Sequence, residues 1–376
     1  MARGKWSIFF LVLVVALGVA PVPAFAAVQS VPVQGGASFN GPVRAVAFMG
    51  DTVYLGGDFS IANADGKRYY RDHLAAVNAR TGALLPFAPE VDGSVHALAV
   101  SGSQLYAGGY FGTVDGAKRR RVARFTSGEL DSWRHVVSGN VRTLAVSDGV
   151  LYAGGSFSTV DSQSRTNLAA WNLSTDTLSA FAPVPDGTVR SVTPGAKRLY
   201  ISGTFASVNG ATARKLAAVS KSTGALDTSF APGMTSIVYD VHLAHDRVYA
   251  AVGGQGGRLI AFDYDGSKRW ETTTDGDVQT VTSIGGTLYA GGHFEHVCSS
   301  PNTGDFGACL DGDKAQRLKF LAVDSNGKLT GWDPWSDSAV GVWTLAASGE
   351  TLAAGGEFLT FANRTVKQRS FALFRP

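Results

Sequence analysis

The stretch Thr287–Phe294, which reads TLYAGGHF, decides the fold because the chain repeats it. Close copies are VYLGGDF at Val53–Phe59, LYAGGYF at Leu105–Phe111 and LYAGGSF at Leu151–Phe157, and weaker copies are LYISGTF at Leu199–Phe205, VYAAVGG at Val248–Gly254 and LAAGGEF at Leu352–Phe358. The period is roughly 50 residues, and such a period in a β-rich chain indicates a propeller or a solenoid. The 46 glycines and the many short apolar runs favour an all-β protein.

Each repeat can be divided into four strands, and the second copy illustrates the division. The predicted strands are Val95–Val100, Gln104–Phe111, Val122–Phe125 and Leu130–Trp133. A phenylalanine follows the small residues in most copies, and its recurrence at repeat spacing predicts packing between sheets. Seven units of this kind predict a seven-bladed β-propeller with four-stranded blades.

The two ends of the chain predict how the ring closes. The last copy contains three strands and ends at Pro376, so its fourth strand is missing. Ala37–Val43 leads into the first inner strand and resembles Leu85–Pro89, the outer-strand segment before Val95, which makes the N-terminal segment, roughly Val28 to Phe39, the candidate for the missing strand. We therefore expect it to complete the last blade, whereas an open solenoid would need caps at both ends.

The repeated pattern resembles that of a known family. LYAGGxF is followed by a V-x-G turn, an arginine, LAAV(N/D), TG and FxP, and this order is similar to the delta-60 repeat β-propeller family of secreted bacterial proteins. The resemblance covers about Val43 to Pro376. It implies a propeller fold and an exported location, and no activity, because the family has no assigned activity to carry over. Leu74–Gly82 (LAAVNARTG) is also similar to quinoprotein-type repeats, but the tryptophan after their TG turn is absent in most copies.

The N-terminus predicts secretion. Arg3 and Lys5 precede the apolar run Ile8–Ala20, and Ala24 and Ala26 form an A-x-A cleavage site. Residues 1–26 therefore read as a signal peptide, and residues 27–376 as a single propeller domain. The alternative is a membrane anchor, but the apolar run is short for a bilayer. We expect a secreted protein, extracellular or at the cell surface, with no membrane insertion after cleavage.

Charge argues against nucleic acid as a partner. The net charge of +3 falls by two when Arg3 and Lys5 are removed, and a near-neutral domain is not typical of an electrostatic nucleic-acid binder. The basic run Lys118–Arg121 lies in one loop and is predicted to be a solvated loop. We expect a monomer whose partner is an extracellular ligand or protein.

Cys298 and Cys309 are the two cysteines of the chain. They lie 11 residues apart in an exported protein, and this context predicts a local disulfide. The alternative is a zinc site that also uses His293 and His296. We expect the disulfide, no metal and no cofactor.

One variable position predicts a site. When the innermost strands are aligned on their first valine, the next residue varies although its neighbours repeat. The residues at this position are Arg44, His96, Arg142, Arg190, Tyr239, Gln279 and, with one residue of ambiguity, Trp343. Closure would bring them together at the mouth of the central channel. Arginine binds carboxylate and phosphate through paired hydrogen bonds, and tyrosine and tryptophan offer stacking faces.

The predicted function is therefore extracellular ligand binding or scaffolding, with an anionic saccharide, a peptide or a cell-wall polymer as the ligand. Two alternatives stay open. The ring residues could serve structure alone, by pointing between blades. The protein could also be an exported enzyme (a lyase, a glycosidase or a quinoprotein-like oxidoreductase) with its site in the channel. We favour a protein that is not an enzyme, and no catalytic residue is predicted.

A second arginine series is predicted to be structural. Arg71, Arg119, Arg165 and Arg317 lie three residues before the third strand, and Arg214 and Arg369 lie two before it. Recurrence in most repeats favours a role inside each blade, such as holding the loop between the second and third strands.

Overall fold

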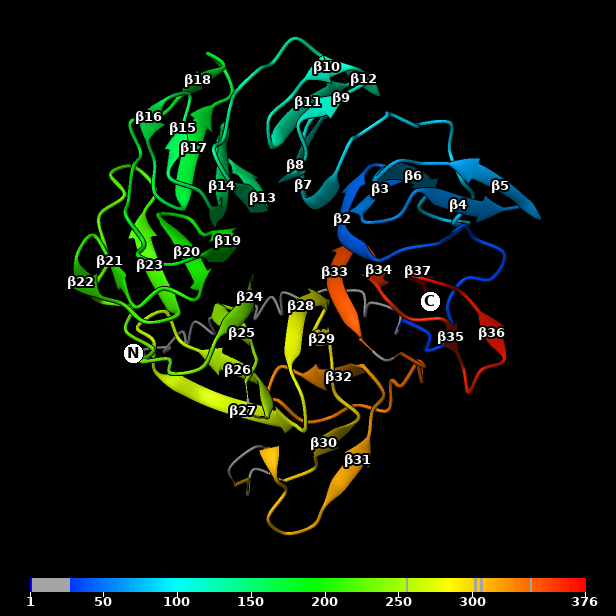
Figure 1. Ribbon diagram of the computed structural model, residues 1–376. Coiled ribbons are helices and arrows are strands. Elements are labelled where there is room, and N and C mark those ends of the chain that lie inside the picture. Colours follow the sequence, from blue (N-terminus) through cyan, green and yellow to red (C-terminus); the bar gives the residue numbers. More distant parts are fainter. Residues whose placement is uncertain (2–27, 255, 301–302, 305–306, 339) are drawn as a thin grey trace.

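The computed structural model describes residues 1, 28–254, 256–300, 303–304, 307–338 and 340–376. The predicted signal peptide lies outside the described residues, apart from Met1. Every named element in the described part is a β-strand. The strands form small antiparallel sheets that are arranged around a common centre (Figure 1). No helix in these ranges is long and apolar enough to cross a membrane.

Each repeat forms a sheet whose strands follow one another in sequence, with its first strand nearest the centre (Figure 1). The sheets are β2 (Val43–Met49), β3 (Thr52–Gly57) and β6 (Leu74–Asn78); β7 (Ser94–Ser101), β8 (Gln104–Tyr110), β11 (Val122–Thr126) and β12 (Glu129–Leu130); β13 (Asn140–Ser147), β14 (Val150–Ser156), β17 (Leu168–Asn172) and β18 (Thr177–Leu178); β19 (Val189–Pro194), β20 (Arg198–Gly203) and β23 (Leu216–Ser220); β24 (Val238–Ala244), β25 (Arg247–Val252), β26 (Gly257–Phe262) and β27 (Lys268–Thr274); β28 (Val278–Ile284), β29 (Thr287–Gly292) and β32 (Phe320–Asp324); and β33 (Val342–Ser348), β34 (Thr351–Gly356) and β37 (Phe371–Phe374).

The fourth strand was predicted for every repeat, and this was wrong in part. Three repeats have a fourth strand, namely β12, β18 and β27. β27 also pairs, through Thr274 and Val297, with β30 (His296–Cys298) of the sixth repeat, so that sheet has six strands. In three other repeats the fourth segment forms only an isolated bridge, as Leu84 does with Val77, Leu226 with Val219 and Leu329 with Val323. These segments leave the sheet after one pair and run toward the next repeat.

Small hairpins between the second and third strands were not predicted. They are β4 (Ile61–Ala64) with β5 (Lys67–Tyr70), β9 (Thr113–Val114) with β10 (Ala117–Lys118), β15 (Thr159–Val160) with β16 (Gln163–Ser164), β21 (Ser207–Val208) with β22 (Ala211–Thr212), β30 (His296–Cys298) with β31 (Lys314–Gln316), and β35 (Thr360–Phe361) with β36 (Val366–Lys367). The short fifth repeat connects β25 to β26 directly. Cys298 ends β30 and is bonded to Cys309, so the disulfide prediction is confirmed and neither thiol is free for zinc.

Glycines let consecutive sheets approach closely. A Cβ atom on Gly56 would lie 2.5 Å from Cγ1 of Val95, the first valine of the next inner strand. The same close contact would arise between Gly108 and Val141, between Gly154 and Val189, and between Gly291 and Val342. It would also arise between Gly355 of the last repeat and Val43 of the first. In these five repeats the first glycine of the motif is therefore required by the neighbouring sheet.

The aromatic residues of the motif also pack between segments. The repeat tyrosine meets an aromatic ring of the fourth segment edge to face in five repeats: Tyr54 with Phe87, Tyr106 with Trp133, Tyr152 with Phe181, Tyr200 with Phe230 and Tyr289 with Trp332. Their centroids lie 5.0–5.6 Å apart, the usual range for such pairs. The phenylalanines after the glycines are buried, as predicted.

The N-terminal segment lies beside the last strand. Gln29 N donates to Arg375 O at 3.0 Å, and Val33 N donates to Leu373 O at 2.7 Å. The predicted range extended to Phe39, and that part is wrong, because β1 (Ser38–Phe39) pairs with β4. Phe39 N also donates to Arg369 O at 3.2 Å, so this end of the segment contacts both the first and the last repeat.

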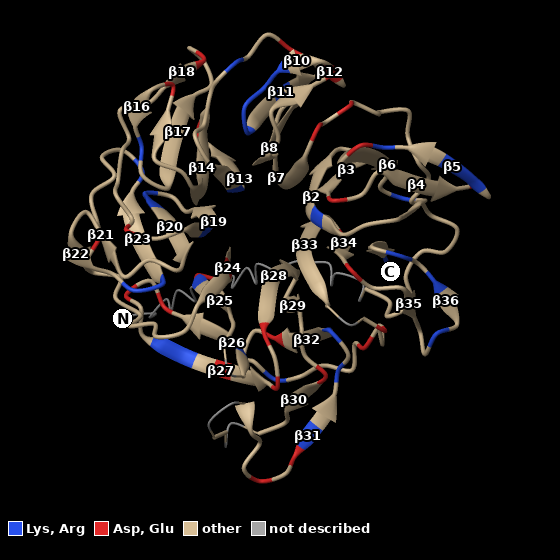
Figure 2. Ribbon diagram, viewed as in Figure 1, with Lys and Arg blue, Asp and Glu red and all other residues tan. Residues whose placement is uncertain are grey.

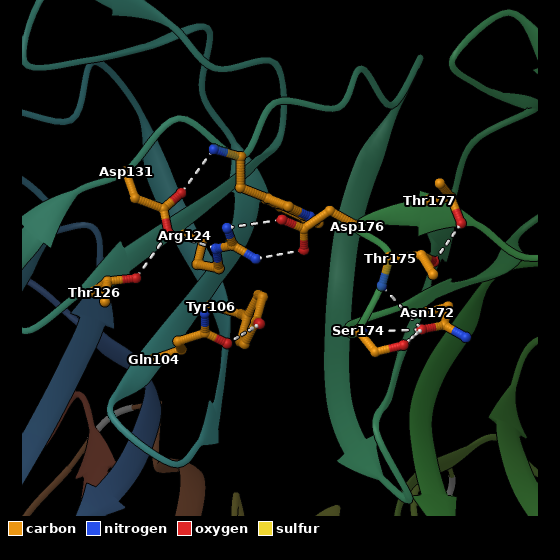
Figure 3. A network of polar contacts seen from close by, with 11 residues as sticks. Gln104, Tyr106, Arg124, Thr126, Asp131, Asn172, Ser174, Thr175, Asp176 and Thr177 are labelled. Carbon is orange, nitrogen blue, oxygen red and sulfur yellow. Dashed lines mark hydrogen bonds and ion pairs between the residues drawn. The ribbon is translucent and has the colours of Figure 1, made fainter.

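One buried cation links two consecutive sheets. Arg124 on β11 stands where most other repeats have alanine, and its guanidinium lies between two carboxylates (Figure 3). Nη1 and Nη2 donate to Asp176 in the β17–β18 turn at 2.6 and 3.0 Å, and Nε donates to Asp131 at 2.5 Å. Although burial acts to lower the pKa of Arg124, the hydrogen bonds that it donates to both aspartates outweigh this effect and raise the pKa above its ordinary value. The network is a fixed, charged crosslink.

We expect Gly291→Ala to destabilise the protein by about 1–3 kcal/mol, because the added Cβ would lie 2.6 Å from Val342 Cγ1. Gly286→Ala in the same hairpin is the matched control, since its Cβ meets nothing within 4 Å. Urea unfolding of the two variants checks this. Equal stabilities would contradict the role assigned to the glycine.

His242 on β24 predicts a pH dependence of stability. Burial, and to a lesser degree the charge of His245, lowers the pKa of His242 from 6.5 to about 4, and its Nε2 lies 2.8 Å from Ser283 Oγ. Below pH 6.5 the imidazole of His242 becomes protonated in the unfolded chain, whereas in the folded chain it stays neutral until about pH 4. We expect about 3 kcal/mol of stability to be lost as the pH falls through this window.

His242→Gln should show less of this loss than the wild type, because the variant has no imidazole to protonate. Urea unfolding at pH 7, 5.5 and 4 measures the difference. The same slope in both proteins would show that His242 does not contribute.

Candidate functional site

A β-bulge occurs at each of the seven predicted ring positions. In β2, Val43 pairs with Gly57 and Ala45 with Gly56, so Arg44 has no partner in the ladder. The same shift skips His96, Arg142, Arg190, Tyr239, Gln279 and Trp343 in the other inner strands. The shift between Val342 and Thr344 also removes the ambiguity over Trp343. A bulge re-aims a side chain, and here it does so once in every inner strand.

The bulged residues meet at the centre of the molecule. All seven line a cavity of about 160 Å³, and they also line an adjoining one of about 210 Å³. Figure 2 shows basic segments on β2 and β13 beside this centre. The structure therefore brings together the seven residues that were singled out.

Arg44 is the arginine of the ring whose charge is paired with that of an acid. Its Nε donates to Asp58 Oδ2, and its guanidinium lies 4.9 Å from the centre of the Trp343 ring. Burial acts to raise the pKa of Asp58, but hydrogen bonds from Ser94 and Arg44 outweigh it, and the pKa falls below its ordinary value. Arg44 is thus neutralised by an acid and stacked on one face of Trp343.

The surroundings of His96 favour its neutral form. Burial lowers its pKa, the hydrogen bond with Asn140 opposes this, and the charge of Arg44 adds to the lowering. His96 Nδ1 lies 2.9 Å from Asn140 Oδ1. A neutral imidazole beside two arginines can gain a proton when an anion arrives.

Tyr239 and Arg190 form a second stacked pair. The guanidinium of Arg190 lies 5.0 Å from the centre of the Tyr239 ring. The tyrosine hydroxyl donates to Asp277 Oδ2 at 3.1 Å, and Gly254 N donates to Asp277 Oδ1 at 2.8 Å. Asp277 is therefore held by Tyr239 and the backbone, not by an arginine.

Two arginines of the ring lack an acidic partner. Among the described residues, Arg142 and Arg190 make no hydrogen bond or ion pair through their guanidinium groups. Burial lowers the pKa of Arg142, and the positive charges of Arg190 and Arg44 add to this effect. In the same ring, Gln279 Oε1 and Trp343 Nε1 have no hydrogen-bond partner. Adjacent, uncompensated guanidinium groups are the arrangement that an anion stabilises.

Asp240 is a cavity residue that the sequence reasoning missed. It follows Tyr239, lines the larger cavity and accepts hydrogen bonds from Val241 N, Ser191 Oγ, Val281 N and Thr280 Oγ1. Burial raises the pKa of Asp240, and these four donors oppose the rise. The signal was present in the alignment, because Asp240 is the one acidic residue at a position that otherwise holds alanine, serine or threonine.

The second arginine series serves structure, as predicted, in four repeats. Arg71 donates to Tyr70 O at 2.7 Å and to Leu85 O at 2.9 Å, so it ties the hairpin to the fourth segment. Arg119, Arg165 and Arg317 each make the same pair of bonds. Arg214 does not, although it was assigned to the series.

Comparisons with known proteins agree with this architecture. A family model described as a β-propeller domain of unknown function (DUF5122) matches residues 147–169. The WD40 β-propeller domain of Doa1 has a TM-score of 0.56 at 12% identity, over 93% of this chain and 97% of that one. The computationally designed Ika8 protein has a TM-score of 0.51 at 14% identity, over 92% and 99%. No curated protein matches. The chain has a β-propeller fold, and at these identities the likeness extends to the fold alone.

Proposed function

We propose that this protein is a secreted, seven-bladed β-propeller of the delta-60 repeat type that binds an anionic group at the mouth of its channel. Closure of the ring is supported by the contact of β2 with β33 and by the fit of Val43 against Gly355. The bonds from Gln29 and Val33 to the last strand support an N-terminal latch. Secretion rests on the sequence of residues 1–26.

The observation that carries the binding proposal is the pair of uncompensated arginines, Arg142 and Arg190. They belong to consecutive sheets and line the same cavities. Arg44 differs, because Asp58 neutralises it. An anion beside Arg142 and Arg190 would receive charge-assisted hydrogen bonds, each worth about 1.5–3 kcal/mol.

The size of the site suggests how the ligand enters. Cavities of about 160 and 210 Å³ are smaller than those that enclose a whole drug-sized ligand. A carboxylate or phosphate group would enter the ring, and the remainder of a saccharide, peptide or wall polymer would stay outside. We propose a binding or scaffolding role for the protein in the extracellular space, as a monomer.

The alternative is an exported enzyme, and one observation favours it. Asp240 lines the larger cavity, next to the ring residue Tyr239, and burial raises its pKa. A protonated carboxyl beside bound substrate is a candidate general acid. Its four hydrogen bonds, which join three inner strands, favour a structural role instead.

We expect Arg142→Gln with Arg190→Gln to lower the affinity for sulfate and for D-glucuronate at least tenfold. The reason is the loss of two positive charges that no acid neutralises. Isothermal titration of residues 27–376 measures this, and the two ligands separate a preference for a tetrahedral anion from one for a carboxylate. Arg68→Gln with Arg120→Gln is the matched control, because both arginines are exposed and the charge change is equal.

Equal loss in both double variants would contradict a site at the ring and indicate a nonspecific charge effect. Turnover of an acidic oligosaccharide by the wild type, lost in Asp240→Asn with binding retained, would favour the enzyme instead.

Anion binding should also depend on pH through His96. Its pKa is lowered in the free protein, and a bound anion raises it, so affinity should rise as the pH falls through the pKa of the bound form. Sulfate keeps its charge throughout this range. Titration at pH 7.5, 6.5 and 5.5 should show the rise in the wild type and a flat profile in His96→Gln. A rise of the same size in the variant would exclude His96 as the proton acceptor.

A further inference from the structure

One repeat differs from the others at a position that normally holds a hydrogen-bonding side chain, and this difference suggests a second site. In each repeat that has a hairpin, one backbone N–H donates to the carbonyl that follows the buried phenylalanine, and we call this residue the bridging position. The bridging residues and their acceptors are Arg71 to Ser60, Arg119 to Gly112, Arg165 to Ser158, Ala213 to Ala206, Arg317 to Glu295 and Gln368 to Leu359. The shared bond shows that these residues are equivalent in space. It also corrects the alignment of Arg214 and Arg369, which lie one residue further on.

At the bridging position an amide or guanidinium normally joins the hairpin to the fourth segment. Arg165, for example, donates to Ser164 O at 2.8 Å and to Ser179 O at 2.6 Å. Gln368 of the last repeat donates to Ala37 O of the N-terminal segment at 2.9 Å. Ala213 is the exception, because its methyl group cannot donate.

The acceptors in the fourth repeat remain in place. Thr212 pairs with Ser207 as Ser164 pairs with Thr159, so Thr212 O corresponds to the first acceptor. Asp227 follows Leu226, which bridges Val219, so Asp227 O corresponds to the second. Within the described part of the chain no side chain donates to either carbonyl, and the one backbone donor is Phe230 N, at 3.3 Å from Asp227 O.

A cavity of about 370 Å³ lies where the guanidinium would be. It is lined by Ala213, Leu216, Leu226, Asp227 and Phe230, among others. Thr212, Thr228 and Ala231 at its rim are exposed, so it opens to solvent. Apolar walls with carbonyl acceptors suit a planar guanidinium, whose five N–H donors lie in one fork.

Nearby positive charge does not exclude such a guest. Arg214 borders the cavity, is exposed and makes no side-chain hydrogen bond among the described residues. In the second repeat, Arg119 occupies its own slot although Lys118, Arg120 and Arg121 flank it in the chain. The backbone acceptors therefore hold a guanidinium even in a basic loop.

We propose that this cavity binds the guanidinium of an arginine side chain presented by a peptide segment of another protein. The guest would make the two hydrogen bonds that Arg71, Arg119, Arg165 and Arg317 make within their own repeats. This site lies on the hairpin side of the fourth repeat and does not depend on the anion site in the ring.

The test uses N-acetyl-arginine N-methylamide as the probe, with the lysine and citrulline analogues beside it. Titration of residues 27–376, followed by amide chemical shifts, should show binding of the arginine probe with shifts around residues 212–216 and 226–231. Ala213→Arg should lower the affinity at least tenfold, because it fills the cavity from within, and should keep a Tm at or above that of the wild type. Ala213→Gln, which copies Gln368, is the second variant if Ala213→Arg does not fold.

Arg165→Ala is the matched control, because it opens the equivalent slot in the third repeat. Its lowered Tm should recover with the arginine probe and not with citrulline. The proposal is overturned if the wild type does not bind the arginine probe, whether or not Arg165→Ala is rescued. It is also overturned if lysine binds equally well, or if a folded Ala213 variant binds as tightly as the wild type.

Discussion

The contact between a glycine of one sheet and a valine of the next is the constraint on which the remaining architecture depends. Where a Cβ atom would lie 2.5–2.6 Å from the valine methyl group, only glycine lets the sheets approach. In these five repeats the contact explains why the glycine is kept while the residue after the pair varies among Asp58, Tyr110, Ser156 and His293. Ser202 and Ala251 stand at the equivalent position in the fourth and fifth repeats. The glycine in the motif that reveals the repeat is thus selected by packing between sheets.

The same inner strands combine a position that is fixed by packing with one that is free to vary. In each of them the valine packs on the neighbouring sheet, the following residue is skipped by the ladder, and pairing then resumes. A skipped residue has no cross-strand partner to match. Its side chain can change without a shift in register, and this is why arginine, histidine, tyrosine, glutamine and tryptophan can all stand there.

Much of this could be predicted from the sequence, because the signals repeat. The strands, the buried phenylalanines and the membership of the ring follow from the recurrence of a pattern or from its failure to recur at one position. The disulfide follows from the spacing of the two cysteines. The bulges could not be predicted, since they depend on how two strands pair and not on which residues they contain. The hairpins were missed because their strands are two to four residues long. Asp240, Arg124 and Ala213 differ from the residues that recur at their positions. The role of each depends on neighbours that are known only from the folded chain.

The contact between the two ends of the described chain has a consequence for the order of folding. Gln368 donates to Ala37 O, 331 residues away, and Gln29 and Val33 donate to the last strand. Bonds between such distant residues incur the largest loop-closure entropy in the molecule, so they form after the local hairpins have assembled. Until then, the last sheet has an unpaired edge strand, β37, with its backbone groups open to other chains. The final contact to form is thus also the one that removes the edge most prone to aggregation.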